Sequence, residues 1–460
     1  MTTTDRLAAD LAALDAAMAG DVVTPADAGW DAARQAWNLT ADQHPAAVAF
    51  AENTNDVVAV VRFARERGLR VAPQTTGHAA PALPGLQGSL LLKTSRMTGV
   101  EIDPDRRTAR AEGGALWEHV AVPAADHGLA ALHGSSGGVG VVGYTLQGGL
   151  GWLARRHGLA CNSVVAAEVV TADGGVLQVD ADHEPELFWA LRGGTGSFGV
   201  VTALEFALYE LSEVYAGQLM WPQEQAPEVI AAFGEWATGA PDTATTSVKL
   251  ANFPPIPAIP EPLRGRSLVS VGVAFCGSQD EGEAVIAPLR EVGERYLDTV
   301  ATIPAADLRW VAGDPPNPVP GQTGGFLLRD LPREALDAYV EVSGPGSGSP
   351  LLFLEVRPLG GALARSSPDH GALDRLDAAA TVYGVGMPVP PPVGRAISAH
   401  FDRVEEALAP WQSESRLLSF ADRSRDAADG FQAETYARLR RAKARYDPDQ
   451  LILSSHEVTP

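Results

Sequence analysis

Residues 134–151 read Gly-Ser-Ser-Gly-Gly-Val-Gly-Val-Val-Gly-Tyr-Thr-Leu-Gln-Gly-Gly-Leu-Gly, and residues 194–199 read Gly-Thr-Gly-Ser-Phe-Gly. Because glycine has no side chain, the backbone N–H groups of such stretches can approach a ligand closely. A diphosphate held between several glycine-rich loops, without the lysine of a phosphate-binding loop, is the ligand that this pattern favours. Tight turns between packed elements are the alternative for each stretch taken alone.

Residues 138–143 and 194–199 both match the Gly-x-Gly-x-x-Gly spacing of dinucleotide-binding proteins. That fingerprint needs a strand before it, a helix after it and an acidic residue about 20 positions later. The stretch at 194–199 runs from an expected helix into an expected strand, and the one at 138–143 follows a helix. We therefore do not expect classical NAD binding. A hydrolase-type Gly-x-Ser-x-Gly match at 134–138 lacks the helix that must follow the serine.

The composition excludes several classes of protein. The chain has 460 residues, with 35 basic against 57 acidic side chains and a net charge of −22, so nucleic-acid binding is not expected. We expect no membrane span, because no apolar run reaches the roughly 18–20 residues required, and no secretory signal. Cys161 and Cys276 make no disulfide framework, which favours a cytoplasmic location, and no residue cluster has metal-ligand spacing. Scarce lysine beside abundant alanine, arginine, glycine and proline indicates a GC-rich bacterial gene.

Apolar periodicity divides the chain into an α+β first part, a middle part and a helical return. In the first part we expect a helix over residues 55–68 that ends at Gly68, and hairpins at 100–112 and 164–180. In the middle part, helices alternate with strands around Pro-rich stretches at 253–263, 314–320 and 387–393. Proline excludes helix and central strand there, so we expect ordered loops. The return includes a helix over residues 434–446.

Four segments together carry a family resemblance: residues 74–80, 133–151, 187–202 and 445–458. In this order along the chain, they resemble the berberine-bridge-enzyme-like oxidoreductases of the vanillyl-alcohol-oxidase/PCMH superfamily. The resemblance implies a two-part, PCMH-type FAD-binding domain formed by residues 1–208 and 404–460. It also implies a substrate domain over residues 209–403, in which helices cover an antiparallel sheet.

The resemblance implies FAD that is covalently linked through His78. In many relatives a cysteine forms a second link, but Ser136 stands at that position, so no cysteinyl link is expected. Val139 stands where relatives control the access of dioxygen, and Tyr144 stands near the flavin ring. The full set of implied cofactor contacts is His78, Gly77, Thr75, Thr76, Ser135, Ser136, Val139, Gly140, Gly143, Tyr144, Gly148, Gly149, Gly151, Gly199 and Val201.

The chain also departs from the family pattern. Gln74 replaces an arginine before the linking histidine, and residues 417–420 lack the Tyr-x-Asn motif that supplies a phenol near the flavin. At the C-terminus, Ser-His-Glu at 455–457 replaces Asn-Gln-Asn. His456 is therefore either a new polar group near the flavin or a neutral replacement.

Glu355 and Arg357 are the leading catalytic candidates in the middle part. Alternation along a strand places both side chains on one face, opposite Leu354 and Val356. A plain ion pair is the alternative. In the functional interpretation, Glu355 is a base or an orienting acceptor, Arg357 tunes it, and Tyr144 or His456 assists.

These residues together predict an FAD-dependent oxidase. The expected reaction transfers hydride from a C–H bond of a small-molecule alcohol, sugar or secondary metabolite to the flavin, and dioxygen then takes the electrons and gives hydrogen peroxide. Two alternatives stay open: oxidative cyclisation, oxygenation or rearrangement of a secondary metabolite, and a flavin-bearing binding protein without turnover. The expected partners are the substrate and dioxygen, and the protein is a monomer or a homodimer.

Overall fold

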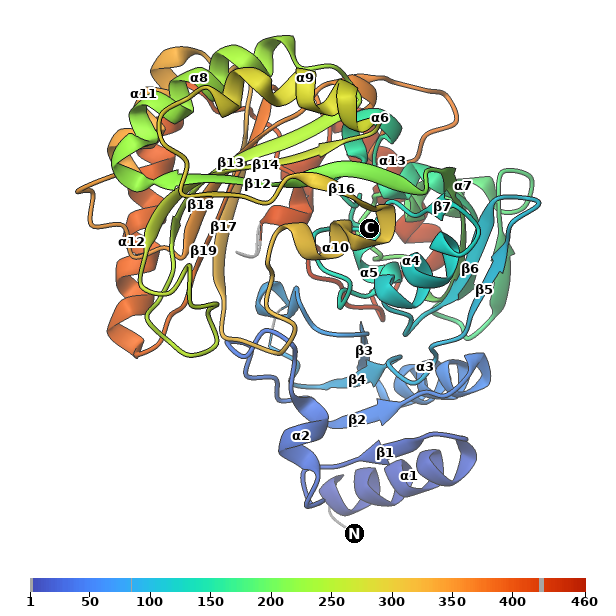
Figure 1. Ribbon diagram of the computed structural model, residues 1–460. Helices are drawn as coiled ribbons and strands as arrows, with labels where there is room; N and C mark the ends of the chain where they lie inside the picture. Colours follow the sequence, from blue (N-terminus) through green and yellow to red (C-terminus); the bar gives the residue numbers. More distant parts are fainter. Residues whose placement is uncertain (1–2, 84, 422–425) are drawn as a thin grey trace.

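Four short strands form the first sheet, in the order β1-β2-β4-β3 (Figure 1). The computed structural model describes residues 3–83, 85–421 and 426–460. Strand β1 runs antiparallel to β2, whereas β2, β4 and β3 are parallel. The elements of this region are α1 (Thr3–Ala17), β1 (Asp21–Val23), α2 (Trp30–Arg34), β2 (Ala47–Phe50), α3 (Thr54–Arg67), β3 (Arg70–Gln74) and β4 (Ser89–Lys93).

Helix α3 confirms the helix expected over residues 55–68, and its ends have clear local causes. The side chain of Asn53 accepts a hydrogen bond from the backbone N–H of Asp56, which caps the N-terminus. Gly68 closes the helix with a φ of +64°, a conformation that glycine adopts without strain. The chain then enters β3, whose last residue, Gln74, begins the loop that carries His78.

A second sheet of five antiparallel strands has the order β5-β6-β10-β8-β9. It contains both expected hairpins, β5–β6 and β8–β9. One helix was not expected: α5 begins within the glycine-rich stretch. The elements are β5 (Val100–Asp103), β6 (Thr108–Glu112), α4 (Trp117–Ala125), β7 (Leu129–Ala130), α5 (Val141–Leu146), α6 (Ala154–His157), β8 (Val164–Val170), β9 (Val176–Val179), α7 (Pro185–Leu191), β10 (Val200–Ala207) and β11 (Tyr209–Glu210), which pairs with β7.

The middle of the chain forms an antiparallel sheet of eight strands, in the order β15-β12-β14-β13-β18-β19-β17, with β16 paired to β12. Helices α8, α9, α11 and α12 lie along one face of this sheet (Figure 1). Its elements are β12 (Glu213–Pro222), α8 (Ala226–Gly239), β13 (Ala244–Asn252), β14 (Ser267–Phe275), α9 (Gln279–Arg290), β15 (Leu297–Asp298), β16 (Ala301–Pro304), α10 (Leu308–Val311), β17 (Gln322–Leu328), α11 (Arg333–Ser343), β18 (Phe353–Pro358), β19 (Ala380–Gly386) and α12 (Pro391–Leu408).

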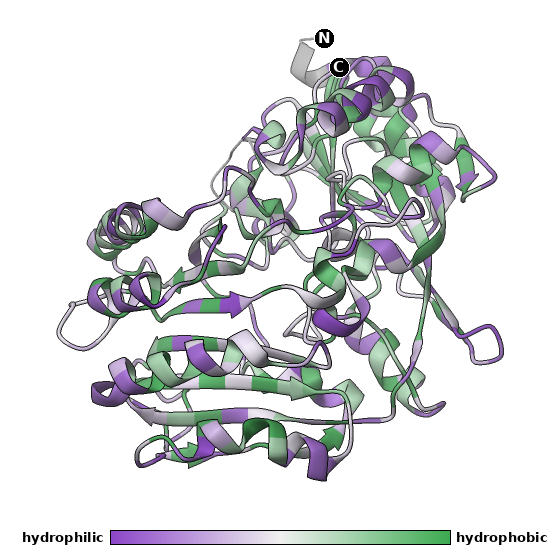
Figure 2. Cartoon of the chain, turned by 90° about the horizontal axis from the view of Figure 1, so that it is seen from above, coloured by the Kyte–Doolittle hydropathy of each residue, from purple (hydrophilic) through white to green (hydrophobic). Residues whose placement is uncertain are grey.

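The hydropathy of the chain matches these layers. In Figure 2 the strands are coloured mostly as hydrophobic, and the peripheral helices alternate hydrophobic with hydrophilic residues. Val248, Leu250, Leu354 and Val356 join the helices in the largest core cluster. The residues between them in sequence therefore face the opposite side of the sheet, toward the first half of the chain. The expected α+β fold, with an antiparallel sheet covered by helices, is confirmed.

The C-terminal segment returns to the first half of the chain. Helix α13 (Ala433–Tyr446) packs Leu439 and Ala442 into the core of the five-stranded sheet. Beyond it, Ile452 forms a parallel bridge with Val71 of β3. The proposed division at residues 208 and 403 stays a prediction, and its second boundary falls inside α12. Among the described residues, no helix is long and apolar enough to cross a membrane.

A buried ion pair holds this return in place. The ammonium of Lys443 donates to Asp447 Oδ2 at 2.6 Å and to the carbonyl of Ser197 at 2.7 Å. The same carboxylate accepts from the backbone N–H groups of Leu451 and Ile452. Both charged side chains are fully buried.

We expect Asp447→Ala to destabilise the protein by about 3–5 kcal/mol, because it leaves Lys443 as an uncompensated buried charge. Urea unfolding monitored by circular dichroism measures this change. Asp449→Ala, at an exposed neighbouring position, is the control and should stay within roughly 0.5 kcal/mol of the parent protein. A loss for Asp447→Ala no larger than that of the control would contradict the prediction.

Candidate active site

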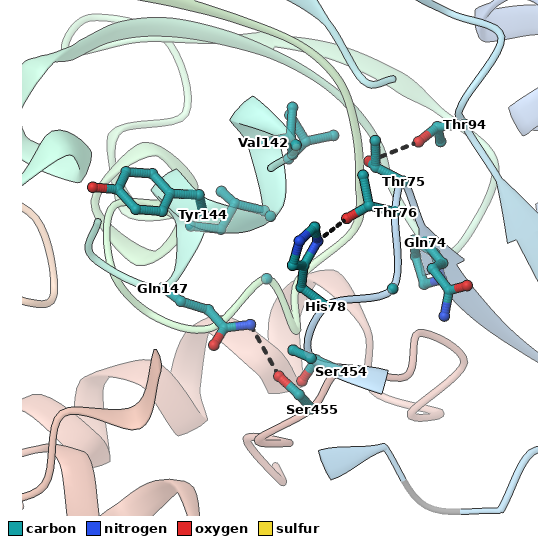
Figure 3. Close-up of a pocket in the computed structure, with 18 of the residues that line it drawn as sticks. Gln74, Thr75, Thr76, His78, Thr94, Val142, Tyr144, Gln147, Ser454 and Ser455 are labelled. Carbon is teal, nitrogen blue, oxygen red and sulfur yellow. Dashed lines mark hydrogen bonds between the residues drawn. The ribbon is translucent and has the colours of Figure 1, made fainter. Parts of the chain in front are cut away.

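The main cavity lies where the loop after β3 meets α5, the start of β10 and the C-terminal tail (Figure 3). Its empty volume, which includes the open mouth, is about 1200 Å³. Of the predicted cofactor contacts, those that line it are Thr75, Thr76, Gly77, His78, Val139, Gly140, Gly143, Tyr144, Gly199 and Val201. Their contact with a cofactor stays a prediction.

His78 is fixed on two sides at the wall of the cavity. Its Nδ1 atom lies 2.7 Å from the hydroxyl oxygen of Thr76, as Figure 3 shows. Its ring stacks on Trp37 with centroids 4.0 Å apart and an interplanar angle of 16°. Burial lowers the pKa of His78 to about 4, so the imidazole is neutral at physiological pH. The ring is thus held in one position as a neutral imidazole. Trp37 is a residue that the sequence analysis missed.

At two positions, Gly77 and Gly140, neighbouring atoms come so close to the backbone that a side chain would not fit. Gly77 has a φ of +88°, and a Cβ there would lie 2.8 Å from the Cβ of Ala36. A Cβ at Gly140, where the second loop enters α5, would lie 3.0 Å from the side chain of Thr75. Thr75 is itself fixed, because its hydroxyl donates to the carbonyl of Gly113 at 2.7 Å. Larger residues would push the two loops apart.

Five other predicted cofactor contacts lie outside the residues that line this cavity: Ser135, Ser136, Gly148, Gly149 and Gly151. The glycines among them make room for neighbours. A Cβ at Gly149 would lie 2.6 Å from the ring of Tyr144, and one at Gly151 would lie 3.2 Å from its hydroxyl oxygen. That hydroxyl is buried without a hydrogen-bond partner among the described residues, and burial raises its pKa, opposed by the charge of Arg357.

Glu355 and Arg357 share one face of β18, as the alternation predicted, and they form an ion pair. Glu355 Oε1 accepts from both Nε and an Nη of Arg357 at 3.0 Å. Its other oxygen lies 3.2 Å from the ammonium of Lys249, which β13 places directly opposite in register. Burial raises the pKa of Glu355, but the two cations overcome it and hold the carboxyl below its usual value. Sequence reasoning missed Lys249, because only strand pairing brings it here.

Neither Glu355 nor Arg357 lines the main cavity. Arg357 lies over the ring of Trp152, with 5.1 Å to the centroid, and its charge acts on Tyr144. The cluster lies on the helix-free face of the large sheet, opposite Leu354 and Val356.

His456 is buried beside the cavity rather than in its wall. Its Nε2 atom lies 2.8 Å from the carbonyl oxygen of Ala421, and its Nδ1 atom has no partner among the described residues. Burial lowers its pKa, opposed by the contact with Ala421. The neighbouring Ser455 does line the cavity and accepts from Gln147 at 3.0 Å (Figure 3). A catalytic role for His456 stays a prediction.

Residues 314–321, which contain the expected Pro-rich stretch 314–320, connect the large sheet to the first half of the chain. Asp314 accepts from the hydroxyl of Ser135 at 2.5 Å. At the other end, the amide of Asn38 donates to the carbonyl of Gly321 at 2.9 Å and accepts from its N–H at 3.1 Å. Asn38 also forms a parallel β-bridge with Val319. This bridging segment is anchored next to Trp37.

The cavity fits FAD by shape and charge. None of its described lining residues carries a carboxylate, and glycines bring backbone close to the space. The hydroxyl oxygen of Ser419 is buried at the wall without a partner among the described residues, which is typical of a group that awaits a ligand. Thr75, Thr76, His78 and Gln147 add polar groups. No set of three or more potential ligands for a metal ion occurs in the described chain.

Comparison with known proteins agrees with this fit. A family described as an FAD binding domain matches residues 45–180. (R)-6-hydroxynicotine oxidase of Paenarthrobacter nicotinovorans is 29% identical over 456 residues, which are 96% of this chain and 97% of that protein.

Two solved structures show the same fold. Berberine-bridge-enzyme-like 1 of Physcomitrella patens has a TM-score of 0.85 at 17% identity, over 97% of this chain and 98% of that one. Glucooligosaccharide oxidase of Acremonium strictum, described with a 6-S-cysteinyl, 8α-N1-histidyl FAD, has a TM-score of 0.82 at 24% identity, over 98% and 99% of the two chains.

We expect Asn38→Ala to loosen the bridging segment, because two hydrogen bonds to Gly321 are lost, each worth about 1 kcal/mol. Hydrogen–deuterium exchange followed by mass spectrometry should show faster exchange over residues 314–321. Asn55→Ala, at an exposed position of α3, serves as the control and should leave this segment unchanged. Equal exchange in the two variants would show that Asn38 does not hold the segment.

Proposed function

We propose a reaction for this chain from the family to which it belongs, the FAD-linked oxidoreductases of the vanillyl-alcohol-oxidase/PCMH superfamily. The chain is an FAD-binding oxidoreductase. In the proposed reaction it is an oxidase of a small-molecule alcohol, sugar or secondary metabolite, acting at a carbon that bears oxygen or adjoins nitrogen. The observation that carries the proposal is its similarity, over 96% of its length, to a protein named as a hydroxynicotine oxidase.

FAD, when bound, supplies the acceptor for a hydride from the substrate C–H bond and passes the two electrons to dioxygen, which becomes hydrogen peroxide. His78 holds the cofactor covalently, and its Thr76 and Trp37 contacts support this role. Val139 lines the cavity, where a valine leaves more room for dioxygen than a leucine. With Ser136 in place of a cysteine, and both Cys161 and Cys276 outside the cavity lining, no cysteinyl link forms.

Glu355 acts on the substrate from the face of the large sheet. Because Arg357 and Lys249 lower its pKa, it stays a carboxylate through the neutral range and is a weak base. We therefore assign it the orienting role: it accepts a hydrogen bond from a substrate O–H or N–H and so positions the adjacent C–H bond for hydride transfer, while solvent takes up the proton. Arg357 and Lys249 fix the carboxylate in position.

His78→Ala should release the flavin from covalent attachment. In acid precipitation, we expect yellow colour in the pellet for the parent protein and in the supernatant for the variant. His127→Ala, at an exposed position, is the control and should keep colour in the pellet. Colour that stays in the His78→Ala pellet would show that His78 is not the attachment site of the flavin.

Glu355→Gln should slow the reduction of bound flavin by substrate by roughly 10²-fold, as for loss of a positioned catalytic group. Stopped-flow absorbance measures the rate, and the flavin spectrum shows whether FAD is retained. The parent rate should be flat at neutral pH and fall only in acid, because the lowered pKa keeps Glu355 charged. Glu341→Gln, on the exposed side of α11, is the control. A native rate for Glu355→Gln would refute the role.

Candidate substrates are screened by peroxide formation, which also tests the oxidase assignment. Oxidation of a substrate with one equivalent of hydrogen peroxide per turnover supports it. Product formation without stoichiometric peroxide would instead favour oxidative cyclisation, oxygenation or rearrangement.

A further inference from the structure

Two lysines in this protein are buried, Lys443 and Lys93, and they differ in whether a carboxylate contacts the ammonium. Lys443 forms an ion pair with the carboxylate of Asp447. Lys93, at the end of β4, donates to the carbonyl of Gln35 at 2.9 Å and to the side-chain oxygen of Gln74 at 2.5 Å. Both acceptors are neutral, and no carboxylate contacts Lys93 within the described chain. A buried cation without an anion is strongly disfavoured, so Lys93 calls for an explanation that Lys443 does not.

Lys93 lies directly beneath the loop that carries His78. Strands β3 and β4 pair Gln74 with Lys93. The side-chain carbon of Gln74 would lie 3.0 Å from a Cβ at Gly77. Gln74 itself lines the main cavity, and so does Thr94, the next residue after Lys93. The ammonium is therefore one hydrogen bond away from the cavity wall, below the turn at Gly77.

The polar groups around Lys93 add no negative charge. The amide of Gln74 donates to the side chain of Gln43, whose own nitrogen is buried without a partner in the described residues. Arg34 and Asp42 form an ion pair with each other nearby, and Arg34 also donates to the carbonyl of Gln43. Burial lowers the pKa of Lys93 to about 8. The carboxylates of this region, Asp31 and Asp42, are both paired with Arg34, and neither contacts Lys93 among the described residues.

FAD brings the missing anion, since its diphosphate carries the formal negative charges of the cofactor. We propose that Lys93 is the buried charge partner of the FAD diphosphate, acting from beneath the Gly77 turn through Gln74 and the loop backbone. Lys93 is a positioning residue and not a catalytic one, because it does not line the cavity. The inference requires FAD in this cavity but not the covalent bond to His78.

The test compares FAD with riboflavin, which lacks both the diphosphate and the adenosine attached to it. The proteins are His78→Ala, in which the flavin exchanges freely, and the same variant with Lys93→Met. Each is stripped of flavin and titrated with FAD and with riboflavin, which has no phosphate. We expect Lys93→Met to weaken FAD binding roughly tenfold or more through loss of the Coulomb term and to leave riboflavin binding unchanged. Equal losses for both ligands, or no loss for either, would overturn the proposal.

The pH dependence gives a second readout. The diphosphate favours the ammonium form, so binding of FAD raises the pKa of Lys93 from about 8 and takes up a proton. FAD affinity of the His78→Ala protein should therefore fall as the pH rises above about 8. Arg34 and Asp42 keep their charges in this range, because their ion pair raises the pKa of Arg34 and lowers that of Asp42. Lys93→Arg should remove the pH dependence and retain affinity.

Thermal stability separates a charge role from a merely structural one. Without flavin, the Lys93→Met protein should melt no lower than its parent, because an uncompensated buried cation has been removed. The gain in melting temperature on loading with FAD should be smaller. Lys443→Met is the matched control: it breaks an internal ion pair, so it should lower the melting temperature of the flavin-free protein. A Lys93→Met protein that melts as early as Lys443→Met, with an undiminished gain from FAD, would make Lys93 structural.

Failure of the covalent link is distinguishable from failure of this inference. If acid precipitation leaves colour in the His78→Ala pellet, His78 is not the attachment site. The Lys93 test then uses the melting temperatures of flavin-free and FAD-loaded protein with His78 intact, where the same smaller gain is expected for Lys93→Met and an undiminished gain refutes the inference.

Discussion

The segment Gln35–Leu39 lies against the turn at Gly77, where the methyl group of Ala36 meets the glycine. A Cβ at Gly77 would lie 2.8 Å from the Cβ of Ala36 and 3.0 Å from its Cα, and the turn requires a φ of +88°. An L-residue with a side chain meets both a steric clash and an unfavourable backbone conformation there. The loop after β3 can therefore take its position only because residue 77 is glycine.

Three residues of that segment then have partners in or beside the site. The carbonyl of Gln35 accepts from Lys93, the ring of Trp37 covers His78, and Asn38 holds the bridging segment 314–321. The ring of His78, the buried cation of Lys93 and the connection to the large sheet are thus coupled to one close contact. A change that lifts the segment by a fraction of an ångström disturbs all three at once, because well-packed groups transmit displacement.

Local patterns predicted what depends on local sequence. The end of α3 at Gly68, the two hairpins and the shared face of Glu355 and Arg357 all follow from periodicity or turn chemistry. Lys249 and Trp37 were not predictable in this way, since their partners are separated from them by 106 and 41 residues and are met only through strand register and loop packing. The glycines at 148–151 show a different limit. Their density in the sequence indicates that backbone must approach another group closely there. Whether that group is a ligand or Tyr144 is decided by the tertiary structure.

The distribution of charge shows the same limit. The chain has a net charge of −22, which argues against nucleic acid, yet its cavity is lined without a carboxylate in the described residues and lies above a buried lysine. The two facts are compatible, because charges on the solvated surface are screened over roughly 8–10 Å at physiological ionic strength, whereas a buried cation acts through a medium of low dielectric constant. Net charge therefore describes how the molecule meets other macromolecules. The electrostatics of the cavity depend instead on the few buried charges beside it, and Lys93, one hydrogen bond from its wall, has the sign opposite to that of the chain as a whole.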